Sequence, residues 1–420
     1  MHTCRSKLSR VGVAALVIAV LSVGSLFAGP QPEAVTDEVT LQYQTLFSGG
    51  EAFIMNDLVQ RFNEEHDLIT VEEVMVEWGE HYTRLMTSIL ADDPPDIAVM
   101  HLAILRDYAG QGVLTPITDL VPDDFDDQFL EPIIEGSYFE GELYAVPIDT
   151  HPFVLYYSTT VLEEAGLVDD DGNVLVPETW DELMDYGRQI RDETDHWGVA
   201  IPPGQSFGER MFISIYYQLG GELYNEAADR LELDIDLASE TYEILMQIYD
   251  EGLHDAELTG AETDAMFLDD RVGFLFNGVW NMARYPDELD VGVTEMPLVA
   301  GDTRYTWADS HSLVFPATGD PARVQAAVTF AQWLSDHSVP WAEAGHLPVN
   351  VDALQSQEFR NMPMRQDYIG AGENAILAPQ AEGWVAIRDE MGEIGELLQL
   401  GQYTPRQAAE ALDAEIRARQ

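Results

Sequence analysis

The order of apolar and polar positions predicts an α/β protein. From residue 39 onward, short runs of β-branched and aromatic residues, typical of strands, alternate with longer runs whose apolar positions recur at helical spacing. The first series is a strand (39–47), a helix (51–65), a strand (69–78), a helix (82–90), a short strand ending at 101 and a helix (104–111). This order is typical of a parallel sheet with crossover helices, in which ligands sit at the carboxyl ends of the strands.

The second half of the chain predicts another mixture of helices and strands, with more helix toward its end. Thr179 and Glu182 form a capping box ahead of a helix over 180–191. Ser239 is expected to cap a helix that ends at Gly252, and Pro residues mark two further helix starts, at 320–321 and 404–405. Strands are expected over 271–278 and 290–298.

One stretch between these regions departs from both patterns. The apolar runs Leu143–Ile148 and Phe153–Tyr157 flank four residues, Asp149, Thr150, His151 and Pro152. A polar break that contains a proline is unusual inside a central strand. We therefore expect the chain to leave one α/β lobe here, cross a cleft and enter a second lobe.

The first 28 residues have the pattern of a secretory signal peptide. A basic start with Arg5, Lys7 and Arg10 precedes an apolar core over 11–21 and a run of small residues that ends at Ala28. An uncleaved anchor is the alternative. The single cysteine, Cys4, precedes the apolar core and is therefore not the acylated cysteine of a lipoprotein. We expect a periplasmic or extracellular protein without a catalytic thiol.

Charge narrows the classes of partner. The chain has 76 Asp and Glu against 20 Lys and Arg, a formal net charge of −56, and the acids are spread along its whole length. Such a field repels nucleic acid and anionic membrane surfaces, so neither is an expected partner. A folded surface this acidic favours adaptation to high salt, with an acidic protein at ordinary salt as the alternative.

Little in the sequence indicates a catalytic site. Carboxylates are too numerous for any pair to be informative, the histidines lack the spacing of a helical zinc site, and the usual nucleophile and phosphate-binding motifs lack a suitable context. The stretches 123–127 and 169–171 could bind calcium but lack the EF-hand pattern, so solvated loops are favoured. We expect no catalytic residue, no cofactor and no metal site.

Four tryptophans indicate a different kind of site. Each lies at or near the expected end of a strand or start of a helix: Trp78, Trp280, Trp307 and Trp384. A flat indole covers the C–H face of a sugar while nearby polar groups bind its hydroxyls. For any single tryptophan a place in the core is the alternative, but the group favours a carbohydrate site.

Several segments occur in an order that is known from one family. They are QRFNEEH (60–66), PPDIAVMHLAILRDYAGQGVLTPITDLV (94–121), LYAVPIDTHPFVLYYST (143–159), ETWDELMDYGRQI (178–190), FNGVWNM (276–282) and GWVAIRDEM (383–391). With these segments the chain resembles, over roughly 39–415, the sugar-binding family of extracellular solute-binding proteins of ABC importers, which includes maltose-binding protein.

The resemblance implies a fold and its boundaries. The fold is the type II periplasmic-binding-protein fold: two α/β lobes, each a mostly parallel sheet flanked by helices, joined by crossing strands and closing over a ligand in the cleft. We expect residues 39–148 plus 270–309 in the first lobe and 149–269 plus 310–420 in the second.

The resemblance also implies ligand-binding positions. Trp280 and Trp384 match stacking aromatics, and His151 replaces an acidic residue of the crossing strand in the maltose binder. Ala103-Ile104 stands where that protein has an Asp-Arg pair. These departures argue against maltodextrin, while another sugar still fits. The remaining expected contacts are Ser48, Gly49, Trp78, Tyr82, Met100, His101, Asp149, Arg210, Met211, Asn277, Trp307 and His311.

The expected function is capture of a sugar or oligosaccharide outside the cytoplasmic membrane and its delivery to the transmembrane subunits of an ABC permease. We expect a monomer that makes and breaks no bond. A binder of a non-sugar solute, such as a polyamine, iron or a phosphate ester, is the nearer alternative. A secreted carbohydrate-active enzyme is the more distant one.

Overall fold

The structure is a computed structural model that describes residues 37–225, 227–228, 230–285, 289–317, 319–379 and 381–419. The chain separates into Met1–Ala34 and Val35–Gln420, and everything below concerns the second unit. The predicted signal peptide (1–28) and Cys4 lie outside the described residues. Within the described part, every helix is too short or too polar to span a membrane.

The strands predicted near the amino end form a first sheet with the order β2-β1-β3-β14-β6. β1 pairs in parallel with β2 and β3, whereas β14 is antiparallel to β3 and β6. The expectation of a mostly parallel sheet therefore holds for β1 to β3, and the sheet as a whole is mixed. Its strands are β1 (Val39–Thr45), β2 (Ile69–Met75), β3 (Ile97–His101), β6 (Ala145–Pro147) and β14 (His311–Val314).

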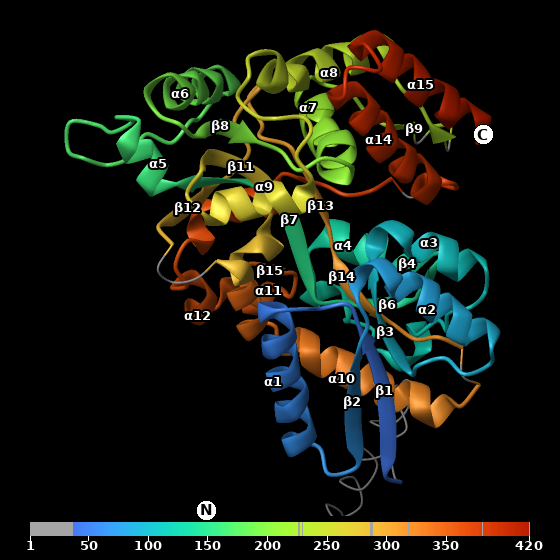
Figure 1. The fold of residues 1–420 in the computed structure, drawn as a ribbon. Helices are drawn as coiled ribbons and strands as arrows, with labels where there is room; N and C mark the ends of the chain where they lie inside the picture. Colours follow the sequence, from blue (N-terminus) through green and yellow to red (C-terminus); the bar gives the residue numbers. More distant parts are fainter. Residues whose placement is uncertain are drawn as a thin grey trace, which may run out of the picture. The chain divides into compact units, whose positions relative to one another are not determined.

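Helices pack against this sheet and enclose a first core (Figure 1). α1 buries Met55, Leu58, Val59 and Phe62, which recur at helical spacing. α10 begins after the N-cap Asp320, as predicted, and packs on β1 and β6. The helices of this part are α1 (Gly50–Glu65), α2 (Trp78–Leu90), α3 (Leu102–Gly110), α4 (Glu131–Gly136) and α10 (Pro321–Asp336).

A second sheet has the order β16-β13-β7-β11-β8, and β12 and β15 also pair with β7. It is mixed as well, because β7 is antiparallel to each of its partners whereas β11 pairs with β8, and β13 with β16, in parallel. Its strands are β7 (Asp149–Ser158), β8 (Trp197–Ala200), β11 (Val272–Gly278), β12 (Val291–Thr294), β13 (Thr306–Asp309), β15 (Leu347–Pro348) and β16 (Ala375–Ile376).

The helices of this second part include the predicted capping box at Thr179 and the predicted helix start at Thr404, which also forms a capping box. The cap expected at Ser239 is instead Asp234, and Ser239 is buried inside the helix. The helices are α5 (Thr159–Glu164), α6 (Trp180–Glu193), α7 (Phe212–Gln218), α8 (Ile235–Asp250), α9 (Gly260–Leu268), α11 (Val351–Gln355), α12 (Gln357–Arg360), α13 (Ile369–Glu373), α14 (Trp384–Gln399) and α15 (Pro405–Ala418).

β7 explains why the stretch over 143–159 looked unusual. Phe153 and Leu155 belong to a second core, whereas Val154 and Tyr156 belong to a separate apolar cluster, so the strand is buried on both faces. The polar residues Asp149–His151 are not a break, because β7 begins at Asp149 and runs through them. In the sheet, His151 pairs with β13, and Asp149 and Thr150 pair with β15.

The chain crosses between the two sheets at three places. β6 leads through Ile148 into β7, as the sequence predicts, and β13 leads through Ser310 into β14. The third crossing follows α10 and reaches β15 near residue 347. The first two are tied together, because the Ile148 amide donates to the His311 carbonyl over 2.9 Å.

The expected lobe boundaries differ from this arrangement after residue 269. β11, β12 and β13, expected in the first lobe, lie in the second sheet, and β14 and α10, expected in the second lobe, belong to the first sheet and core. The reason is that a strand's periodicity shows that it is buried but not which sheet it joins.

Candidate functional site

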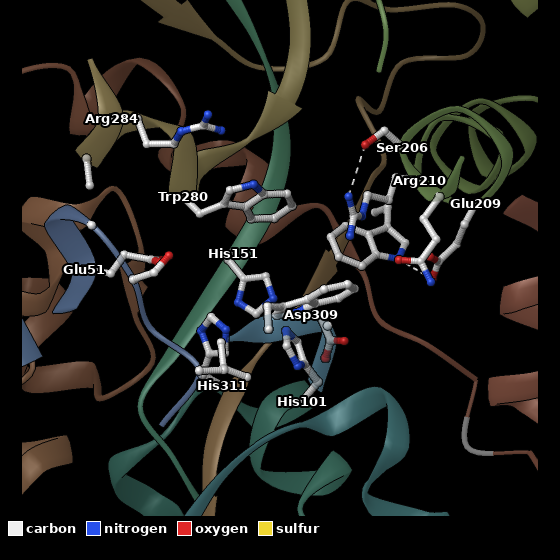
Figure 2. Close-up of a pocket in the computed structure, with 18 of the residues that line it drawn as sticks. Glu51, His101, His151, Ser206, Glu209, Arg210, Trp280, Arg284, Asp309 and His311 are labelled. Atoms are coloured by element: carbon white, nitrogen blue, oxygen red, sulfur yellow. Dashed lines mark hydrogen bonds between the residues drawn. The ribbon is translucent and has the colours of Figure 1, made fainter. Parts of the chain in front are cut away.

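A cavity of about 760 Å³ is lined by residues from both sheets (Figure 2). On one side it meets the carboxyl ends of β1, β2 and β3, where the sequence predicts a ligand. On the other side it meets the turn after β11, the strand β13 and helix α14. The structure brings ten of the expected contacts to this cavity: Ser48, Gly49, Trp78, Tyr82, His101, His151, Arg210, Trp280, Trp307 and His311.

Five expected contacts do not line the cavity. Met100 is buried in the first core, and Met211 and Trp384 are buried in the second. Asn277 is buried beside Asp264, to which its side-chain amide donates over 3.0 Å. Asp149 is fully buried behind His151 and His311. Each of these five residues lies at or near a position whose neighbour in the sequence faces the cavity. The resemblance identifies the segment but not which of its side chains is exposed to the cavity.

Further polar residues line the cavity that the sequence did not single out: Glu51, Gln205, Ser206, Glu209, Arg284, Asp309 and Arg388. A signal was present for some of them. Asp309 lies midway between Trp307 and His311, and Arg388 is one helical turn after Trp384. Glu209 directly precedes Arg210.

Two indoles and a guanidinium form one wall. Trp280 follows β11 in a short 3-10 helix, and Trp307 lies in β13; their ring centroids are 6.3 Å apart with an interplanar angle of 88°. The guanidinium carbon of Arg210 lies 4.9 Å from the centroid of each ring. Cation–π attraction to both rings therefore holds Arg210 in place, and its Nη1 donates to the Ser206 hydroxyl over 3.1 Å.

Two polar atoms at this wall have no hydrogen-bond partner among the described residues. They are Nε of Arg210 and Oε2 of Glu209, and both are buried. The other carboxylate oxygen of Glu209 accepts from Nε1 of Trp307 over 3.2 Å. Unmatched buried donors and acceptors are costly in a folded protein, and these two belong to adjacent residues of the cavity lining.

The Glu209 carboxyl is set apart by its burial. Burial raises its pKa from an ordinary value of 4.5 to about 7, although the neighbouring Arg210 opposes that change. In the unfolded chain the carboxyl loses its proton near the ordinary value, while the folded protein retains it. Stability therefore falls as the pH rises from about 4.5 to about 7 and stays lower above that range.

We expect Glu209→Gln to remove this part of the pH dependence. At about 1.4 kcal/mol per pH unit, the interval from 4.5 to about 7 corresponds to about 3 kcal/mol. The variant should exceed the original protein in free energy of unfolding at pH 8 by up to this amount and match it near pH 4.5. Denaturant unfolding across this range measures the difference. A constant offset between the two curves would contradict the assignment to Glu209.

Glycines set the distance between this wall and helix α14. A Cβ on Gly208 would lie 2.0 Å from the Met391 carbonyl, and one on Gly395 would lie 2.6 Å from the Gly208 Cα. The π-helical turn Ser206–Met211 and α14 therefore pack backbone to backbone. This close approach brings Arg388 of α14 to the same cavity as Glu209 and Arg210.

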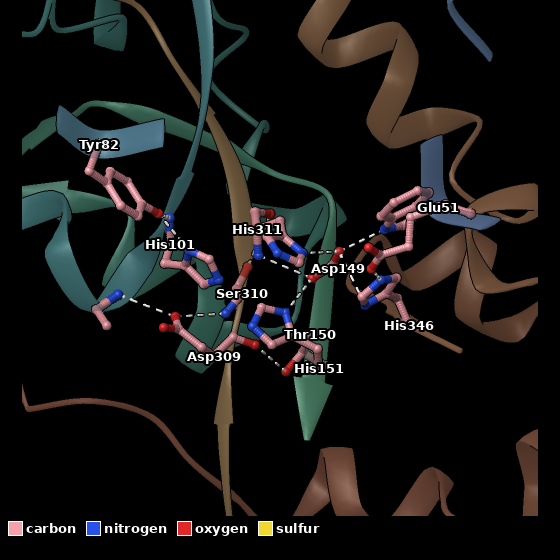
Figure 3. A network of polar contacts seen from close by, with 12 residues as sticks. Glu51, Tyr82, His101, Asp149, Thr150, His151, Asp309, Ser310, His311 and His346 are labelled. Atoms are coloured by element: carbon pink, nitrogen blue, oxygen red, sulfur yellow. Dashed lines mark hydrogen bonds and ion pairs between the residues drawn. The ribbon is translucent and has the colours of Figure 1, made fainter. Parts of the chain in front are cut away.

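A buried polar network lies behind the cavity, centred on Asp149 (Figure 3). Its carboxylate accepts from Nδ1 of His151 over 3.0 Å, from Nδ1 of His311 over 2.8 Å and from Nε1 of Trp341 over 2.6 Å. These charge-assisted bonds hold its pKa well below its usual range against the opposing effect of burial. His151 and His311 thus reach the cavity with one ring nitrogen already held from behind.

Comparisons with known proteins agree with this architecture. A family model described as a bacterial extracellular solute-binding protein matches residues 57–366. The maltotriose-binding protein of Pyrococcus abyssi is 23% identical over 339 residues, which cover 78% of this chain and 71% of that protein. The arabinooligosaccharide-binding protein of Bacillus subtilis is 23% identical over 380 residues, covering 85% and 83% respectively.

A solved structure shows the same fold. The GacH receptor of Streptomyces glaucescens, solved unliganded and with acarbose, matches with a TM-score of 0.80 at 20% identity, over 91% of this chain and 98% of that one. The expected type II binding-protein fold is thereby confirmed. With a family model that spans most of its length and two α/β parts joined by three crossings, the chain belongs to the bacterial extracellular solute-binding proteins.

Proposed function

We propose that this protein captures a sugar or oligosaccharide in the cavity between its two sheets and delivers it to the permease of an ABC importer. The observation that supports this most directly is the unmatched pair at the cavity wall, Nε of Arg210 and Oε2 of Glu209, beside the indoles of Trp280 and Trp307. A hydroxyl group accepts from the first atom and, when Glu209 is ionised, donates to the second. The adjacent C–H face of a sugar ring packs on an indole.

The charges that line the cavity argue against a polyamine and against a phosphate ester. Arg210, Arg284 and Arg388 disfavour a polyamine, which carries only positive charge. Glu51, Glu209 and Asp309 disfavour a phosphate ester. A neutral ligand with many hydroxyls can use both sets as hydrogen-bonding partners. The named ligands of the relatives, maltotriose, arabinooligosaccharides and acarbose, are all of this chemical class.

Binding is coupled to the arrangement of the two parts. The cavity takes residues from both sheets, so a ligand in it contacts both at once. A ligand shifts an equilibrium between an open and a closed state only by its difference in affinity for the two, and contact with both walls supplies that difference. The closed, loaded protein then docks on the permease as a monomer. No bond is made or broken, so the protein is a carrier and not an enzyme.

We place the protein outside the cytoplasmic membrane, where its family acts, and in a salt-rich environment. The net charge of −56 favours the second part of this proposal, because counterions at molar salt screen the repulsion between the acids. Binding experiments therefore belong at molar salt.

A thermal-shift screen at molar salt tests the proposed function. The purified protein is incubated with mono- and oligosaccharides, with a polyamine and with a phosphate ester, and a sugar is expected to raise the melting temperature by mass action. Calorimetry should give one sugar per chain. Turnover of a glycan, or a response only to the polyamine or the phosphate ester, would overturn the proposal.

A further inference from the structure

Three histidines and an aspartate converge where the three crossings between the sheets meet. Asp149 lies just after the first crossing, with His151 two residues on, while His311 follows the second crossing and His346 lies in the third. One side-chain donor atom from each of the four lies within 4.8 Å of the others. All four residues are between 0% and 4% exposed. No other group of this kind is found among the described residues.

The His346 ring has an unmatched nitrogen in this cluster. Its Nε2 lies 2.8 Å from the Glu51 carboxylate, which only accepts, so Nε2 bears the proton. In the neutral ring Nδ1 is then a bare lone pair, and it faces Oδ2 of Asp149 at 3.7 Å (Figure 3). That Nδ1 is buried and has no hydrogen-bond partner among the described residues. Two electron-rich atoms that face each other away from water repel, and a positive charge between them would remove this repulsion.

We propose that Asp149, His151, His311 and His346 bind a divalent transition-metal ion, with Zn²⁺ as the best match. Three imidazole nitrogens and one carboxylate oxygen make a common zinc ligand set. Zinc bonds of about 2.0–2.2 Å place tetrahedral ligand atoms about 3.3–3.6 Å apart. Oδ2 of Asp149 lies 2.8 Å from Nδ1 of His311 and 3.7 Å from Nδ1 of His346, and Oδ1 lies 3.0 Å from Nδ1 of His151. These values bracket the required separation, so small side-chain movements suffice.

The groups around the cluster fit this assignment. The hydrogen bond from His346 to Glu51 is the carboxylate–histidine contact that orients metal-bound imidazoles and determines their tautomer. Trp341 stacks on His346 with ring centroids 4.7 Å apart and an interplanar angle of 8°, and it also donates to Asp149. When the metal binds at Nδ1 of His151 and His311, each neutral ring carries its proton on Nε2 instead of Nδ1, and a doubly protonated ring releases its Nδ1 proton to solvent.

The metal of this site is a resident of the protein and not its cargo. The cluster is buried behind the cavity, and its ligands come from all three crossings. A metal there links the three crossings and therefore stabilises the connection between the two sheets. Two of the ligands, His151 and His311, also line the cavity, but metal binding is measured without sugar and does not involve the unmatched pair at Arg210 and Glu209, so its failure is distinguishable from failure of the proposed function.

Metal binding to the chelator-treated protein tests this inference. Zn²⁺ in molar KCl is expected to bind at one ion per chain and to raise the melting temperature without any sugar. Co²⁺ is expected to give the intense visible absorption of a tetrahedral site. His346→Gln and, separately, His311→Gln should weaken Co²⁺ binding about a hundredfold or more. The matched control is His196→Gln, a histidine that pairs with Glu164 at the surface.

Three outcomes would overturn the inference. One is the absence of a Zn²⁺-dependent shift together with the absence of the tetrahedral Co²⁺ spectrum, which would mean that a second proton on His346 supplies the positive charge. Another is equal Co²⁺ affinity in His346→Gln and in the control, which would assign binding to surface carboxylates. The third is a stoichiometry that rises with added metal without saturating at one. Cooperative melting of both variants without metal shows that they are folded.

Discussion

Alanine at both Trp280 and Trp307 is expected to weaken sugar binding by about a thousandfold. Truncating a buried aromatic anchor at the centre of a binding site costs about 2 kcal/mol or more, which is roughly a 30-fold loss for each residue. The two indoles are perpendicular and belong to different elements, so one ligand can pack against both. Arg210 rests on both rings and loses its support in the double variant.

Titration calorimetry with the sugar found in the screen measures this loss, with the single variants alongside. Trp197→Ala is the matched control, because Trp197 lies in β8 and does not line the cavity. Its affinity should stay within about twofold of the original. Trp307 is only 5% exposed, so circular dichroism must first show that its variant is folded. Unchanged affinity in the folded double variant would rule out stacking on these indoles.

Asp149→Ala is expected to lower the free energy of unfolding by about 3–5 kcal/mol. The change leaves four donors to the carboxylate without an acceptor: Nε1 of Trp341, Nδ1 of His151, and the backbone amide and Nδ1 of His311. All of these donors are buried, and the loss of one partner from a buried charged network costs about this much. The affected residues connect both sheets, so the whole transition should shift.

Denaturant unfolding in the presence of a chelator measures this effect apart from any metal. Asp57→Ala is the control, because Asp57 is exposed on α1, and its change should stay within about 0.5 kcal/mol. Asp149→Asn should fall between the two, since an amide keeps one acceptor but turns the other into a donor. A loss below about 1 kcal/mol in Asp149→Ala would show that the network contributes little to the fold.

Local patterns predicted the elements well where one physical signal dominated. The capping boxes at Thr179 and Thr404 and the N-cap Asp320 are where the side chains indicated, because a cap is decided by three or four adjacent residues. The prediction was wrong where two signals competed. Asp234 caps α8 in place of Ser239, which is buried inside the helix.

Part of the site could be read from the sequence and part could not. Trp280 and Trp307 were identified because a strand end followed by an aromatic residue is a local pattern, and both line the cavity. Trp384 satisfies the same pattern but is buried in the second core, since its helix packs with that face inward. Glu209 and Arg388 were missed because their importance depends on a backbone contact between Gly208 and α14, far apart in the chain.

The sequence by itself determined that this is an acidic α/β protein with two parts, a crossing at Ile148–Asp149 and aromatic residues at the ends of its elements. Each of these properties depends only on adjacent residues or on overall composition. Only the tertiary structure decided which sheet β11 and β14 join, and which residues meet at the crossings. His346 shows why: it is 195 residues from His151, and nothing local marks it until the fold brings its unmatched nitrogen to Asp149.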